Sequence, residues 1–150
     1  MADFESVLDK KIEEVEKPKP KPVGTYLGVL QGLPTQKKVG QDEMDVIGFR
    51  VKLIAPQDDV DAEALADQPP ISEWPALRHD IFVHTEQGVW GLKQFLSRTL
   101  GFEEGEGKTI RQSLAETPGR QLLVKLRQRP FINRDNQPEI ATEIESTAHV

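Results

Sequence analysis

The stretch from Gly119 to Pro130 constrains the fold of this chain more than any other. Apolar side chains alternate with mainly polar ones along it, which predicts a β-strand with one buried face and one face in water. Because the wet face carries cations although the net charge of the chain is −6, the strand also predicts a basic surface. The alternating residues are Leu122, Val124 and Leu126 against Leu123, Lys125 and Arg127.

Other segments extend this pattern into a fold. Alternating sequences predict four more strands, at Thr25–Gln31, Val46–Leu53, Leu77–His84 and Pro138–Ile144, with a loop from Gly32 to Met44. Helical spacing predicts a helix over Gly88–Leu100, ended by Gly101, and a capping box predicts a second helix starting near Thr109. Five strands with a helical element between the third and fourth predict a mainly β chain folded as a five-stranded OB-fold-like barrel.

The first 22 residues are predicted to form a separate unit, followed by the OB-fold-like domain over residues 23–150. Asp3 to Lys17 has the pattern of an N-terminal amphipathic helix, and a Lys-Pro linker follows up to Pro22. An isolated helix of this length is marginal in water, so it must pack on something. Its own domain and another subunit are both open as that surface. The apolar positions are Phe4, Val7, Leu8, Ile12 and Val15.

An acidic insertion over residues 55–76 separates the second and third predicted strands. Between Pro56 and Trp74 there are six carboxylates and no Lys or Arg. The charge of this segment, −6, equals the net charge of the whole chain. We expect this polar, proline-rich segment to lie outside the core, with one helical turn near Asp61–Leu65. Trp74 would anchor this loop or a partner, whereas Trp90 is expected to be partly in the core.

The composition excludes several classes of protein. With no cysteine, the chain has no disulfides, no thiolate zinc site and no cysteine nucleophile. No signal peptide or membrane span is predicted, so a cytoplasmic location is expected, in the host cytoplasm if the protein is phage-encoded. The P-loop-like run Gly105–Thr109 has Phe102 where the motif needs glycine. No enzyme, cofactor or metal site is therefore predicted.

Three short motifs carry a family resemblance: Pro-Val-Gly-Thr-Tyr at 22–26, Leu-Lys-Gln-Phe-Leu-x-x-x-Leu-Gly at 92–101, and Gly-Arg-x-Leu-x-Val at 119–124. With them, the chain resembles phage-encoded OB-fold single-stranded-DNA-binding proteins over roughly Pro22 to Ile144. The resemblance implies a single-stranded-DNA-binding protein that supports DNA replication or recombination. It also implies replication or recombination proteins as partners.

OB folds bind nucleic acid across strands two and three and on the loops joining strands 1–2 and 4–5. Cations along these elements would contact phosphates and aromatic rings would stack on bases. The alternative is that the cations only keep the outside of the barrel wet and that Phe82 is packed under other elements. The candidate nucleic-acid-binding residues are Lys37, Lys38, Arg50, Lys52, Phe82, His84, Lys125, Arg127, Arg129, Phe131 and Arg134.

A second class of function fits the same barrel. In a protein-interaction or assembly module, the N-terminal helix, the acidic insertion and Trp74 would contact protein, including another copy of the chain. A third hypothesis is an inhibitor whose acidic segment mimics DNA. The sequence leaves open the preference for DNA or RNA, the oligomeric state and the identity of protein partners.

Overall fold

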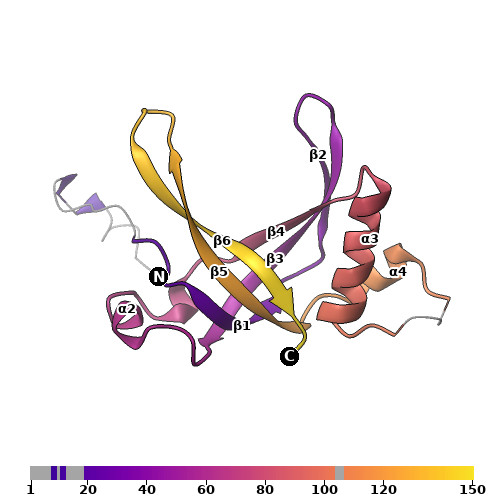
Figure 1. The fold of residues 1–150 in the computed structure, drawn as a ribbon, viewed down its shortest axis with the longest axis horizontal. Coiled ribbons are helices and arrows are strands. Elements are labelled where there is room, and N and C mark those ends of the chain that lie inside the picture. The colour runs from indigo at the N-terminus through magenta and orange to yellow at the C-terminus, as the bar shows by residue number, and fades with distance from the viewer. Residues whose placement is uncertain (1–7, 10, 13–18, 104–106) are drawn as a thin grey trace.

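The structure is a computed structural model that describes residues 8–9, 11–12, 19–103 and 107–150. These residues form a mainly β protein with one six-stranded antiparallel sheet in the order β2-β3-β1-β5-β6, and β4 paired with β3 (Figure 1). The strands are β1 (Gly24–Leu30), β2 (Thr35–Val39), β3 (Met44–Pro56), β4 (Leu77–Phe82), β5 (Gln121–Ile132) and β6 (Pro138–Ala148). The helical elements are α2 (Ala62–Ala66), η2 (Ile71–Glu73), α3 (Glu86–Gln94), η3 (Phe95–Thr99) and α4 (Ile110–Ala115).

The alternation predicted between Gly119 and Pro130 is confirmed in β5. Leu122 and Val124 have no exposed surface and Leu126 is 1% exposed, whereas Lys125 and Arg127 are exposed. One face of β5 therefore belongs to the hydrophobic core, where the burial of each large apolar side chain contributes about 1.5–3 kcal/mol. The strand is longer than expected and continues to Ile132.

The predicted loop from Gly32 to Met44 is wrong, because it contains the extra strand β2. Val51 of β3 pairs with both Leu30 of β1 and Leu77 of β4, which places β1 and β4 on opposite edges of β3. Gly48 likewise pairs with both β2 and β4. β1 and β2 therefore lie on the same edge of β3, one after the other. The sequence of β2 is polar with two adjacent lysines, so burial gave no signal for it.

The sheet is curved but open. Among the described residues no ladder pairs β4 with β6, so closure into a barrel is not observed. The helical region after β4 lies across this gap. The ring of Phe95 is 5.2 Å from the ring of His79 on β4, and Thr99 Oγ1 is 3.0 Å from Thr147 Oγ1 on β6. The side chains of η3 therefore fill the position where a closing ladder would lie.

Both predicted helices are present, with most of their expected ends. The Thr85 side chain caps α3, Thr109 and Gln112 form the capping box of α4, and Gly101 has a φ of +75° after η3. The expected apolar face is buried, except at Val89. The expectation for Trp90 is wrong: its side chain is 56% exposed. The buried positions are Leu92, Phe95, Leu96 and Leu100.

The acidic segment is not external to the core, contrary to expectation. Val60 and Trp74 are only 8% and 3% exposed and belong to the core cluster. The Trp74 ring packs edge-on against Tyr26 at 5.7 Å, and its Nε1 donates a hydrogen bond of 2.9 Å to the Pro69 carbonyl oxygen. The expected helical turn is confirmed as α2. Trp74 thus anchors the acidic segment to the sheet of its own chain, and the carboxylates of the segment remain at the surface.

The predicted N-terminal helix lies outside the described residues, apart from residues 8–9 and 11–12. The last part of the Lys-Pro linker is described, and it is hydrogen-bonded to the sheet. The backbone N of Lys21 donates to Thr142 Oγ1 at 2.9 Å, and Gln128 Nε2 donates to the Lys21 carbonyl oxygen at 2.9 Å. The chain is therefore fixed to the β5–β6 hairpin before β1 begins.

Candidate nucleic-acid interface

The side of β3 that faces away from the core forms one surface with β2 and β4, here called the outer face. The opposite side of β3 carries Ile47, Phe49, Val51 and Leu53, which are at most 8% exposed. Strand alternation therefore directs the intervening residues outward. Paired residues in neighbouring strands place three rungs on the outer face: Arg50 opposite Arg78, Gly48 between Thr35 and Asp80, and Val46 between Lys37 and Phe82.

A groove of about 570 Å³ runs along the outer face. Three cations and one carboxylate line it, so its formal charge is +2 although the chain is acidic overall. Such a local positive surface attracts an anionic ligand whatever the total charge. The lining residues are Thr35, Lys37, Gly48, Phe49, Arg50, Pro75, Ala76, Arg78 and Asp80.

Arg50 and Arg78 are directly opposite each other on neighbouring strands. Like charges in this position destabilise a sheet. Asp80 Oδ2 compensates Arg78 at 3.1 Å and Lys37 Nζ at 3.5 Å, but Arg50 has no ion pair in the part of the chain that the structure describes. A bound anion between the two guanidinium groups would relieve their repulsion, and planar guanidinium groups suit phosphate oxygens.

Gly48 is what allows Asp80 to lie within this face. A Cβ at Gly48 would stand 2.8 Å from Thr35 Oγ1 and 2.9 Å from Asp80 Oδ1, closer than real Cβ atoms approach. The missing side chain therefore leaves room for the Asp80 carboxylate between the strands. From there Asp80 holds Lys37 and Arg78 on the surface of the groove.

Two aromatic side chains extend the outer face beyond the groove. Phe82 is 42% exposed, and its ring lies 6.0 Å from that of His84 in an edge-on arrangement. His84 is exposed and lies two residues past the end of β4. The prediction that it belongs to this strand is therefore wrong. Exposed rings beside cations provide surfaces on which bases can stack.

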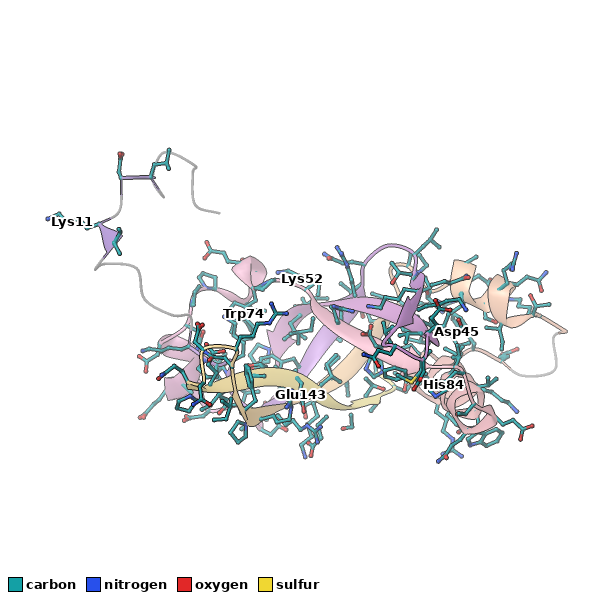
Figure 2. The ribbon with its side chains drawn as sticks, turned by 90° about the horizontal axis from the view of Figure 1, so that it is seen from above. Lys11, Asp45, Lys52, Trp74, His84 and Glu143 are labelled. Carbon is teal, nitrogen blue, oxygen red and sulfur yellow. The ribbon has the colours of Figure 1, made fainter. Side chains whose placement is uncertain are left out.

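Two other predicted residues are engaged elsewhere. Lys38 lies in β2 next to Lys37, so it points to the opposite face, and its Nζ is 3.2 Å from Asp45 Oδ1. Lys52 points outward as expected, but its ammonium donates to the carbonyl oxygens of Trp74 and Ile71. Figure 2 shows Lys52 and Trp74 next to each other. Lys52 therefore ties the acidic segment to β3.

The cations of β5 form a second surface, on which each cation has a carboxylate partner. Arg127 and Arg129 both bind the Glu143 carboxylate, at 2.7 and 3.0 Å, and Lys125 Nζ is 3.5 Å from Glu145 Oε2. Hydrogen bonds from Arg129 and Arg127 hold the pKa of Glu143 below its usual range. Since β1 separates β5 from β3 in the sheet, these residues do not join the outer face.

The remaining candidates lie at the end of the β5–β6 hairpin. The Arg129 guanidinium is 5.8 Å from the centre of the Phe131 ring, and Arg134 is exposed in the turn between the two strands. Figure 1 shows the β2–β3 and β5–β6 hairpins extending to the same side of the sheet at its two ends. Phe131 and Arg134 thus belong to the second of two projecting hairpins.

Arg78 was missed by the sequence prediction. It has the same parity as Phe82 and His84 in the predicted third strand, so alternation alone would place it on their face. The structure adds Arg78 and Asp80 to the candidate interface.

Comparison of the chain with protein-family models and with curated proteins gives no match. Within the described ranges, no helix has the length and apolar character needed to cross a membrane.

Proposed function

We propose that this protein binds single-stranded nucleic acid, in the first place DNA, across the outer face of β2, β3 and β4. The observation that carries the proposal is Arg50 directly opposite Arg78 in a groove of net charge +2. Backbone phosphates would occupy the groove, and the adjacent Phe82 and His84 rings would stack on bases. This combination is what sequence-tolerant single-strand binding requires.

The topology supports assignment to the OB fold. β1 and β2 follow each other along one edge of β3 and together correspond to the first OB strand. The helical region lies between β4 and β5, as the fold requires, and the outer face corresponds to the strands on which OB folds bind oligonucleotides. The β2–β3 and β5–β6 hairpins would flank the bound strand. A role in phage replication or recombination is proposed on the sequence resemblance.

Titration of the full-length protein with a labelled dT oligomer and with duplex DNA of equal length tests this proposal. Fluorescence anisotropy should show tighter binding to the oligomer, and the affinity should fall steeply as salt rises. An RNA oligomer of the same length tests the choice of DNA. Equal affinity for duplex and single strand, or binding that does not depend on salt, would contradict single-strand recognition through phosphates.

A protein-interaction module is the second candidate function. Its expected contacts through Trp74 are not supported, because Trp74 is buried in the core of its own chain. The observation that favours it is the 56% exposure of Trp90, on the side of α3 that faces α4. This surface is compatible with nucleic-acid binding on the outer face.

A further inference from the structure

An apolar groove lies between α3 and α4, away from the outer face. It has a volume of about 560 Å³. Trp90, Ile110 and Val89 are 56%, 43% and 39% exposed beside it, and Lys93 Nζ lies 4.9 Å from the centre of the Trp90 ring. A contiguous exposed surface of large apolar side chains on a small protein marks an interaction site. Its apolar lining is Val89, Trp90, Leu96, Phe102 and Ile110.

A second apolar surface is offered by the N-terminal arm, residues 1–18. Its sequence has apolar residues at helical spacing, and Leu8 and Ile12 are 67% and 91% exposed. Their own domain therefore does not cover these two side chains. In Figure 2, Lys11, between them in sequence, lies well away from the sheet. An arm of this kind needs a surface to pack on.

As the helix predicted from the sequence, the arm would be too short to reach the groove of its own molecule. Its base is fixed at Lys21, before β1, whereas Leu30 at the opposite end of β1 is hydrogen-bonded to Gly119 and Arg120, in the segment between α4 and β5. The seven residues of β1 span about 23 Å, and the linker residues before it add about 15 Å. A 15-residue helix is only about 22 Å long.

Charge also disfavours packing of the arm on the nearest part of its own domain. Pro20 accepts a hydrogen bond of 3.0 Å from Gln68, which places the base of the arm beside the acidic segment. Residues 1–18 contain six carboxylates and three lysines, a net charge of −3. Two acidic segments side by side repel each other, so packing of the arm on this surface would be unfavourable.

We infer that the arm of one molecule packs into the α3–α4 groove of a second copy of the chain. The arm and the groove are different surfaces, so the contact is heterologous. Unless two molecules exchange their arms reciprocally or the contact closes into a ring, each dimer keeps one unused arm and one unused groove, and the contact builds open chains. The association itself does not depend on the proposed function. If the proposed function holds, such chains would follow a nucleic-acid strand and bind it cooperatively.

Sedimentation of the full-length protein over a range of concentrations, without nucleic acid, tests the inference. The average mass of the wild type should rise past that of a dimer. Ile12→Asp damages only the arm and Trp90→Asp only the groove, so each variant alone should remain monomeric. An equimolar mixture should form a dimer and nothing larger, because the intact arm of one variant fits the intact groove of the other.

Other occupants give different results, each of which would overturn the inference. Arm-to-arm pairing would leave Trp90→Asp associated, and packing within one molecule would leave the wild type monomeric at every concentration. Ile132→Asp, at a residue 62% exposed on the β5–β6 hairpin, is the matched control and should associate like the wild type. Loss of association in this control, with Trp90→Asp unaffected, would move the acceptor surface to the hairpin. Melting curves verify that all three variants fold.

Discussion

The Lys52 ammonium donates a hydrogen bond to the carbonyl oxygen of Trp74 and so joins β3 to the end of the acidic segment. We predict that Lys52→Met lowers the free energy of unfolding by about 1.5–3 kcal/mol, the range for a hydrogen bond to a charged group. Affinity for a dT oligomer should change little. Urea denaturation and anisotropy measure the two quantities.

Lys38→Met is the matched control for this variant. Lys38 is exposed and forms an ion pair with exposed Asp45, so its loss should change stability by less than about 1 kcal/mol. Lower oligomer affinity of Lys52→Met with unchanged stability would contradict the structural role and return Lys52 to the binding surface.

Arg50 and Arg127 are both exposed arginines on strands, but among the residues that the structure describes only Arg127 of the two has a carboxylate partner. We predict that Arg50→Ala weakens binding to all single-stranded sequences alike. It should also reduce the slope of log affinity against log salt by about 0.7, the value for one phosphate contact. Arg127→Ala should leave the slope unchanged, because Arg127 is bound to Glu143 and lies outside the outer face. Equal effects of the two substitutions would show that the β5 surface also binds phosphates.

Phe82 is 42% exposed, whereas Phe95 is 5% exposed in the core. We predict that Phe82→Ala reduces single-strand affinity by roughly 1–3 kcal/mol through lost stacking, with a smaller loss of stability. Phe95→Ala, the buried comparison, should cost about 3–5 kcal/mol of stability. Thermal melting and oligomer titration of both variants separate the roles. Stability loss at Phe82 with unchanged affinity of the folded protein would contradict the stacking role.

Sequence periodicity predicted the parts of the fold in which burial alternates strongly. The alternation in β5 and β3 correctly predicted which side chains are buried. These are Leu122, Val124 and Leu126 in β5 and Phe49, Val51 and Leu53 in β3. β2 was missed because Thr35–Val39 is held by backbone pairing with β3 and buries little side-chain area. Whether the sheet closes into a barrel depends on contacts between distant residues, such as Thr99 with Thr147. No local sequence pattern predicts such contacts.

For the candidate site, the sequence predicted side-chain direction but not side-chain partners. Arg50 and Phe82 share the face that alternation assigned to them. The engagement of Lys52 with Trp74, and of Arg127 with Glu143, depends on which distant residue lies opposite. Because the acidic segment contains six carboxylates, it was predicted to lie outside the core. Its apolar residues Val60 and Trp74 nevertheless connect it to the core.

His79 provides a prediction about pH. Burial beside Phe95 lowers the pKa of His79 below its usual value, and the nearby Asp80 charge partly opposes this effect. The unfolded chain therefore takes up this proton first, near pH 6.5, and acidification below that value destabilises the fold. We predict a decline of at most about 1.4 kcal/mol per pH unit from this group.

His79→Phe should remove that part of the decline between pH 7 and pH 5, because it keeps an aromatic ring against Phe95 without a titrating group. Urea denaturation at several pH values measures it. Carboxylates such as Glu143, whose pKa is lowered, lose their contribution to stability only at more acidic pH, so they do not interfere between pH 7 and pH 5. An unchanged pH dependence in the variant would contradict the assignment to His79.

Gly88 and Gly91 lie three residues apart in α3 but in different surroundings. A Cβ at Gly88 would overlap the carbonyl oxygen of Phe82 and stand 2.9 Å from its carbonyl carbon, whereas a Cβ at Gly91 would meet nothing within 4 Å. We predict that Gly88→Ala destabilises the fold by about 1–3 kcal/mol, since rigid backbone must shift. Gly91→Ala should stabilise it by up to about 1 kcal/mol through higher helix propensity. Urea denaturation compares the two, and oligomer binding by Gly88→Ala should weaken as well, because displacement of α3 from β4 moves Phe82. Equal stability of the two variants would show that α3 does not approach β4 this closely.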